Sequence, residues 1–454
     1  MTTVIRNGTL VFADRCQKAD LLIEEETIRA IGADLQGDQV IDAAGCLVFP
    51  GFIDGHTHLD MPVSGTVTSD DFASGSTAAL AGGTTMLIDF ATQDKGDTLA
   101  HALEIWHSRA DGNCSCDYGF HMAVTDWNER TRAELHEMAN AGITSFKCYY
   151  AYDALMLSDP EMYDILCEMK QIGGILGVHC ENGPVLNRLR EKALAEGHTD
   201  PSWHPKTRPA LVEGEAVSRF LRIAALADAP AWIVHLSTDD GRREIALARA
   251  RGQKVLVETC PQYLLLDESV YEKPDFEAAK YVCSPPLRSK ADQQSLWEAV
   301  QQGEIDIVST DHCSFHFHGQ KEMGRNDFTL IPNGMPGIEH RPTVMYTAGV
   351  ASGKITASDL CRMLAENPAK MFGLYPKKGV LAVGSDADLV IFDPTKQTTI
   401  SAKAQYQNCD YTPYEDFQTA GAVRDVFLRG THAVQNGKVV QKGLGRYVKR
   451  ERSR

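Results

Sequence analysis

The strongest constraint on the fold is a series of eight continuous apolar runs that alternate with helix-like segments. Runs of this kind are typical of parallel strands that are buried on both faces. Helical candidates fill the intervals, for example at residues 158–172, 213–227 and 240–251. Eight such units predict an α/β fold, a (β/α)8 TIM-like barrel. The runs span residues 47–53, 85–90, 118–124, 143–149, 175–179, 231–236, 254–258 and 305–309.

Both ends of the chain have a different pattern, in which short strand-like segments are separated by Gly, Asn and Asp. We therefore expect the two ends to combine into one smaller β-sandwich domain of residues 1–50 and 376–454, beside a catalytic barrel of residues 51–375. The short segments are residues 3–5, 9–12, 20–24, 28–31, 387–392 and 422–430.

Composition limits the partners of the chain. Its 454 residues include 45 Lys and Arg against 61 Asp and Glu, a formal net charge of −16. This balance argues against nucleic acid or an anionic membrane as a partner, since both require clustered basic residues. The basic run at residues 449–454 is interpreted as a solvated tail. No apolar stretch approaches the ~20 residues that span a bilayer and no signal peptide is evident, so we expect a cytoplasmic protein.

Side chains that can bind metals follow five of the predicted strands. Two histidines at positions i and i+2 of a strand point to the same face, so both can reach one metal ion. Any single member of the set is equally compatible with a buried, hydrogen-bonded histidine or a surface carboxylate. Because the strand ends of a barrel meet at one face, five of them together favour a site. The set is His56 and His58 at the end of the first strand, Lys147 on the fourth, His179 and His235 at the ends of the fifth and sixth, and Asp311 at the end of the eighth.

Lys147 is the unusual member of this set. A lysine ammonium has no lone pair to donate and is repelled by metal cations. Unmodified, Lys147 is interpreted as a substrate anchor or an ion-pair partner. If its amine captured carbon dioxide, the resulting carbamate would be an anionic oxygen donor that could bridge two metal ions.

A set of motifs runs along nearly the whole chain, beginning with GFIDGHTHLDMP at residues 51–62. Together the motifs resemble those of the cyclic amidohydrolases called D-hydantoinases and dihydropyrimidinases. The remaining matching segments are residues 65–72, 145–147, 178–182, 234–236, 258–263, 284–288, 310–313, 327–329, 331–334 and 410–415.

The resemblance implies two zinc ions per subunit, bridged by a carbamylated (N6-carboxylated) Lys147. The same resemblance implies a homotetramer. The implied ligands are His56, His58 and Asp311 for the more buried ion, and His179 and His235 for the more exposed ion.

The resemblance also implies the reaction. A metal-bridging hydroxide would open the cyclic amide of a 5-monosubstituted hydantoin or a dihydropyrimidine, giving the N-carbamoyl amino acid. Asp311 would act as general base and then general acid, and Tyr152 would stabilise the developing oxyanion. The backbone of Ser284 and Asn333 would hold the amide groups of the ring. Without this resemblance, Tyr152 would be interpreted as a packing residue and Asn333 as a turn residue.

Substrate preference is left open by the sequence. We expect loops with Leu59, Met61, Tyr149 and Met156 to line the pocket for the 5-substituent. Family members often have phenylalanine at the positions of Tyr149 and Met156. Neutral drift of the loops and a changed preference for aryl or alkyl groups are both compatible with these differences.

Two other functions compete with this interpretation. One is another cyclic amidohydrolase, allantoinase-like or an imidase. The other is a non-catalytic scaffold related to dihydropyrimidinase. Such scaffolds have lost metal ligands, whereas all six ligand positions are filled in this chain.

Overall fold

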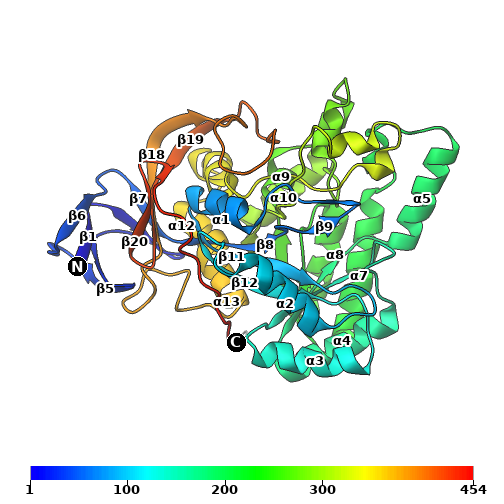
Figure 1. Ribbon diagram of the computed structural model, residues 1–454, viewed down its shortest axis with the longest axis horizontal. Helices are drawn as coiled ribbons and strands as arrows, with labels where there is room; N and C mark the ends of the chain where they lie inside the picture. Colours follow the sequence, from blue (N-terminus) through cyan, green and yellow to red (C-terminus); the bar gives the residue numbers. More distant parts are fainter. Residues whose placement is uncertain (1, 453–454) are drawn as a thin grey trace.

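The computed structural model describes residues 2–452, and its largest element is a parallel eight-stranded barrel (Figure 1). Each barrel strand pairs with the next along the chain, in the order β8-β11-β12-β13-β14-β15-β16-β17. A parallel bridge between Thr57 and His312 joins the two edges of this sheet. The predicted barrel is therefore confirmed. Its strands are β8 (Phe52–Thr57), β11 (Thr84–Thr92), β12 (Asp117–Ala123), β13 (Ser145–Tyr149), β14 (Ile175–His179), β15 (Ala231–Ile233), β16 (Val255–Thr259) and β17 (Ile307–Val308).

Helices fill the intervals between the strands and cover the outside of the barrel. The start of α4 shows how the sequence sets their limits. Ser158 and Glu161 form a capping box, Pro160 lies in the first turn, and the helix ends at Gly173 in the left-handed conformation. The longer helices are α1 (Phe72–Ala81), α2 (Leu99–Ala110), α3 (Glu129–Asn140), α4 (Asp159–Ile172), α5 (Gly183–Ala195), α7 (Ala210–Ala227), α8 (Asp239–Ala250) and α10 (Lys290–Gln301).

The first apolar run is divided between two sheets, which corrects the prediction of one barrel strand over residues 47–53. Residues Leu47–Pro50 form β7, which pairs antiparallel with β18 (Leu389–Thr399) outside the barrel. Gly51 lies between β7 and β8, and its N–H donates to the carbonyl of Asp388 at 2.8 Å. At Gly51 the chain therefore crosses from the outer sheet into the barrel. The sequence does not indicate this crossing, because both strands are buried and so form one continuous apolar run.

Two smaller sheets pack face to face beside the barrel. The seven-stranded sheet has the order β21-β20-β19-β18-β7-β2-β3 and so combines strands from both ends of the chain. Its partner is the four-stranded sheet β5-β4-β1-β6. Buried side chains from both sheets, among them Ile5, Leu21, Val48 and Leu389, form one apolar cluster. The predicted β-sandwich from both termini is confirmed, and Figure 1 shows its blue and red strands side by side. The strands are β1 (Thr2–Arg6), β2 (Thr9–Val11), β3 (Cys16–Lys18), β4 (Asp20–Glu24), β5 (Thr27–Gly32), β6 (Gln39–Asp42), β19 (Gln418–Leu428), β20 (Thr431–Gln435) and β21 (Lys438–Val439).

The basic segment near the C-terminus is anchored to the barrel at Arg450, which corrects the prediction of a solvated tail at that residue, while Lys449, Glu451 and Arg452 are exposed as expected. The N–H of Val448 donates to the carbonyl of Tyr118 on β12 at 2.8 Å. Arg450 is only 4% exposed, and its guanidinium donates to Ser145 Oγ at 2.7 Å and to the carbonyl of Phe120. The basic side chain is buried because carbonyl and hydroxyl oxygens accept its hydrogen bonds. Residues 453–454 lie outside the described residues.

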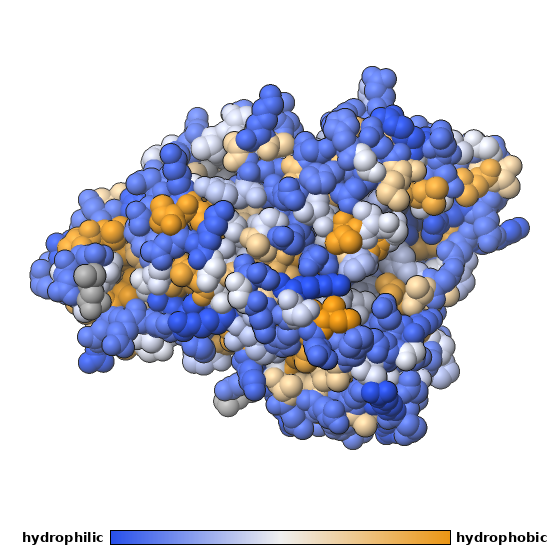
Figure 2. Space-filling view, in the orientation of Figure 1, coloured by the Kyte–Doolittle hydropathy of each residue, from blue (hydrophilic) through white to orange (hydrophobic). Residues whose placement is uncertain are grey.

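The face seen in Figure 2 is mostly hydrophilic, with apolar side chains scattered in small groups. Across residues 2–452, no helix combines the length and apolar character needed to cross a membrane. All 12 cysteines carry free thiols.

Candidate metal centre

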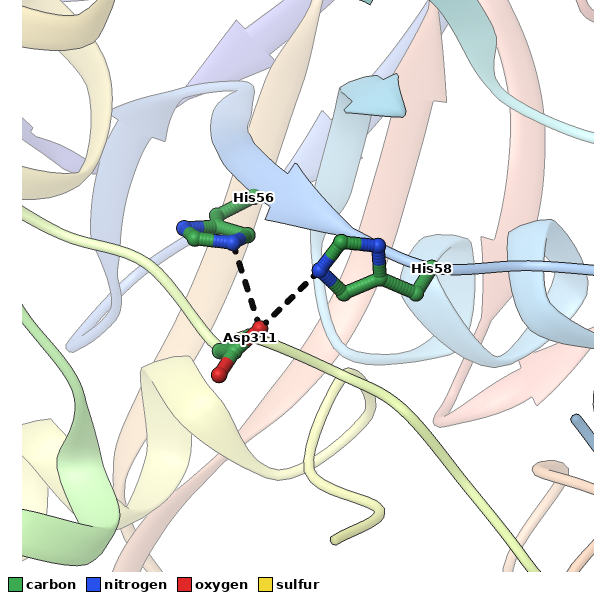
Figure 3. A group of neighbouring side chains, drawn as sticks. All are labelled: His56, His58 and Asp311. Carbon is green, nitrogen blue, oxygen red and sulfur yellow. Dashed lines mark ion pairs between the residues drawn. The ribbon is translucent and has the colours of Figure 1, made fainter. Parts of the chain in front are cut away.

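Three of the predicted ligands meet at one end of the barrel. His56 is the last but one residue of β8, His58 lies just beyond the strand, and Asp311 follows β17. Both imidazole Nε2 atoms face one oxygen of Asp311, at 3.2 Å from His56 and 3.1 Å from His58 (Figure 3). The donor atoms of the three residues lie within 4.8 Å of one another. This spacing suits simultaneous binding of one ion by two nitrogens and one carboxylate oxygen.

The other three predicted ligands lie beside this group. Lys147 on β13 places Nζ 2.8 Å from His56 Nε2. His179, at the end of β14, and His235, after β15, face each other with 3.0 Å between Nδ1 and Nε2. Lys147 is 2% exposed, and burial lowers the pKa of its amine. The structure therefore brings all six predicted ligand residues together.

Two carboxylates that the sequence analysis left without a role orient these histidines. Glu258, near the end of β16, accepts from His56 Nδ1 at 2.6 Å and from the N–H of His235 at 3.1 Å. Glu181 accepts from His179 Nε2 at 2.8 Å. The bonds from the rings of His56 and His179 fix the tautomer of each ring and leave its other nitrogen free to bind a metal, whereas His235 is held by its backbone N–H alone. Only their positions in the sequence could have identified these two carboxylates. Glu181 follows His179 by two residues, and Glu258 ends the seventh predicted strand.

The charges at the site suit divalent cations. Burial alone would raise the pKa of Asp311, but the charge of His56 and hydrogen bonds from His56 and His58 hold it well below its usual range. Burial lowers the pKa of His58 to about 4. Asp311 and His58 therefore have the forms that bind metal ions, an ionised carboxylate and a neutral imidazole. The pKa of His56 is raised, because the carboxylates of Glu258 and Asp311 outweigh burial and the charge of Lys147. The residues present fit a metal centre.

Three site residues have left-handed backbone, which is uncommon outside glycine. The φ angles are 69° at Tyr152, 37° at His235 and 50° at Asp311. Such conformations cost about 1–3 kcal/mol each and persist only where the surroundings enforce them. Next to Asp311, the N–H and hydroxyl of Thr310 donate to the buried carboxylate of Asp54 at 3.1 and 2.8 Å. All three residues line the same cavity.

An open cavity of about 430 Å³ lies over the ligand residues. Among the predicted pocket residues, Met61, Tyr149, Tyr152, Ser284 and Asn333 line it. The structure does not bring Leu59 or Met156 to its wall. Leu59 is fully buried in the core, where its methyl groups lie against Gly75.

One face of α2 also lines the cavity, and sequence reasoning missed it. Ala102, Ile105, Trp106 and Arg109 follow a helical spacing of three and four residues. Trp106 donates to the buried carboxylate of Asp89 at 2.9 Å, which anchors this wall to β11. The spacing was visible in the sequence, but it is equally typical of a helix that faces the core.

The chain was compared with known proteins. Residues 47–440 match the amidohydrolase family. A D-hydantoinase from Geobacillus stearothermophilus is 48% identical over 99% of this chain and 97% of its own, and one from Streptomyces coelicolor is 44% identical over 99% and 98%. The crystal structure of a dihydropyrimidinase from Brevibacillus agri superposes with a TM-score of 0.99 at 49% identity, over the full length of both chains. The chain therefore belongs to the amidohydrolase family, in the group of the D-hydantoinases and dihydropyrimidinases.

Proposed function

We propose that the protein is a zinc-dependent hydrolase of cyclic amides. Its substrates are 5-monosubstituted hydantoins, dihydropyrimidines or both, and its product is the N-carbamoyl amino acid. The convergence of six potential ligand residues under one open cavity carries this proposal. The names of the relatives, D-hydantoinase and dihydropyrimidinase, support the substrate class.

In this proposal His56, His58 and Asp311 hold one zinc ion, and His179 and His235 hold a second. Lys147, carboxylated at its amine, would supply oxygen ligands to both ions. Burial lowers the pKa of the Lys147 amine, which supports the modification, because only the neutral amine attacks carbon dioxide. When bound, the two ions lower the pKa of water to about 7 and polarise the amide carbonyl.

Two side chains of the protein, Asp311 and Tyr152, transfer or donate the protons that the reaction needs. Asp311 accepts the proton of the attacking water and delivers it to the ring nitrogen that leaves. Its position supports this role, because the carboxylate lies against both histidines that would hold a zinc ion. Tyr152 donates its hydroxyl proton in a hydrogen bond to the developing oxyanion. Burial raises the pKa of Tyr152 to about 12, so the hydroxyl stays protonated and able to donate.

Ser284 and Asn333 bind the amide groups of the ring through their backbone, at the cavity wall. Met61 and Tyr149 contact the 5-substituent from the same cavity. We further propose a cytoplasmic homotetramer, in which residues 1–50 and 376–454 form the β-sandwich unit and residues 51–375 the catalytic unit.

The test is the rate of ring opening of dihydrouracil and of racemic 5-phenylhydantoin by enzyme supplied with zinc and bicarbonate. Lys147→Ala serves as the control, and zinc is counted in both proteins. We expect hydrolysis of at least one substrate by the wild type and none by the variant. Zinc-loaded wild type that opens neither ring would contradict the proposed substrates, and a chain without zinc would favour the non-catalytic scaffold.

A further inference from the structure

A fully buried lysine lies behind one wall of the cavity. Lys321, in the 3-10 helix η3 (Lys321–Gly324), has an exposed fraction of 0%. Its Nζ donates to three backbone carbonyls, at 2.8 Å to Val282, 2.6 Å to Pro332 and 2.7 Å to Gly334. Three N–H donors therefore meet three acceptors, which satisfies a buried ammonium without a carboxylate. Nothing in the reaction described above uses this residue.

The three carbonyls belong to the two backbone segments that form this wall. Ser284 lies two residues after Val282, and Asn333 lies between Pro332 and Gly334. Both Ser284 and Asn333 line the cavity. The N–H of Gly334 also donates to the carbonyl of Val282 at 3.0 Å, so the two segments are joined directly as well as through Lys321.

The backbone conformation of the second segment, residues 332–334, is tightly restricted. Gly334 has a φ of 152°, and a Cβ at this position would overlap the carbonyl of Cys313. Only glycine allows this close approach. The ammonium of Lys321 therefore fixes a segment that is already pressed against its neighbour, and small displacements there would reach the cavity wall.

Lys321 also affects the donor strength of one backbone group. The carbonyl of Pro332 and the N–H of Asn333 belong to the same peptide unit. A hydrogen bond to a peptide oxygen polarises the unit and makes its N–H a better donor, and a charged donor does so more strongly. Burial lowers the pKa of Lys321 to about 8, so the ammonium form still dominates at neutral pH.

We propose that Lys321 is a positioning residue for the substrate, which fixes and polarises the backbone of Asn333 and holds Ser284 in register with it. This inference rests on the proposed function, in which that backbone binds the amide groups of a cyclic substrate. Lys321 acts through the backbone and does not touch the substrate itself.

The test compares steady-state kinetics of wild type and Lys321→Met with the better of the two ring substrates. Methionine has a similar length and volume but no donor. Loss of one substrate hydrogen bond costs about 1 kcal/mol, so we expect KM to rise about five- to tenfold while kcat changes less than about threefold. Lys321→Gln restores two N–H donors, and its KM should fall between the other two.

Lys378→Met is the matched control. Lys378 is equally buried but contacts the carboxylates of Asp117, Asp386 and Asp388 rather than backbone carbonyls. Its loss should lower the melting temperature without changing KM. A KM for Lys321→Met within twofold of wild type would overturn the proposal, as would a loss of bound zinc that accounts for the whole change in rate.

Hydrogen–deuterium exchange gives a readout that needs no substrate. In Lys321→Met, amides of residues 282–284, 331 and 333–335 should exchange at least about tenfold faster, while those of residues 54–58 stay unchanged. Unchanged exchange in both segments would refute the positioning role. A zinc-loaded wild type that opens no cyclic amide would refute the proposed function instead, so the two failures are distinguishable.

Discussion

Replacing Glu258 by Gln should weaken the metal centre without unfolding the protein. Glu258 and His56 both have fully buried side chains, and the carboxylate accepts from His56 Nδ1 at 2.6 Å. Gln keeps the volume and one acceptor oxygen but removes the negative charge. The histidine then loses a charge-assisted hydrogen bond and the fixed tautomer that presents Nε2 to the metal.

The magnitude follows from this bond. A hydrogen bond to a charged group contributes about 1.5–3 kcal/mol, and 1.4 kcal/mol corresponds to a tenfold change in an equilibrium constant. We therefore expect metal affinity to fall about 10- to 100-fold. The weaker bond from the N–H of His235, at 3.1 Å, can still be made to the Gln oxygen and adds little to the loss.

The assay is competition with a chelator, in which zinc retained by the protein is counted at each chelator concentration. Glu168→Gln is the matched control, because Glu168 has a side chain only 3% exposed and pairs with Arg132 and His136 on the outside of the barrel. That variant should lose stability but keep its zinc. Zinc affinity within threefold of wild type in Glu258→Gln, with the melting temperature unchanged, would refute the role assigned to this carboxylate.

Four further outcomes are expected. Lys147→Ala should reduce bound zinc from two ions to about one per subunit, as counted by elemental analysis. Tyr152→Phe should lower kcat by about 10²–10³ with little change in melting temperature, because one oxyanion donor is lost. Gly82→Ala should lower the melting temperature, since its Cβ would overlap the backbone carbonyl of Glu339. Burial raises the pKa of Glu339 to about 7 from 4.5, so the folded state binds more protons between these values and this contribution to stability falls as pH rises from 4.5 to 7. Denaturant titrations of Glu339→Gln should lack that component.

The barrel and the clustering of the six candidate ligand residues were predictable because both depend on local patterns. A parallel strand that is buried on both faces must be apolar along its whole length, and the fold then fixes where its last residue lies. That is why His179, the last residue of β14, was placed correctly. The crossing at Gly51 and the burial of Arg450 were not predictable, because each depends on partners that are hundreds of residues away. Leu59 was predicted to line the pocket but is buried in the core for a related reason, since its neighbours in the motif do not determine the direction in which its side chain packs.

The seven-stranded sheet has a consequence for folding. Its centre pairs β7, at residues 47–50, with β18, which begins at residue 389. During synthesis β7 therefore emerges long before its partner, and the intervening barrel must be made while an apolar strand edge stays uncovered. Contacts so distant in sequence slow folding, and an exposed edge is prone to pair with another chain. Yield of soluble protein should therefore depend on chaperones and on growth temperature more than the stability of the finished enzyme would suggest.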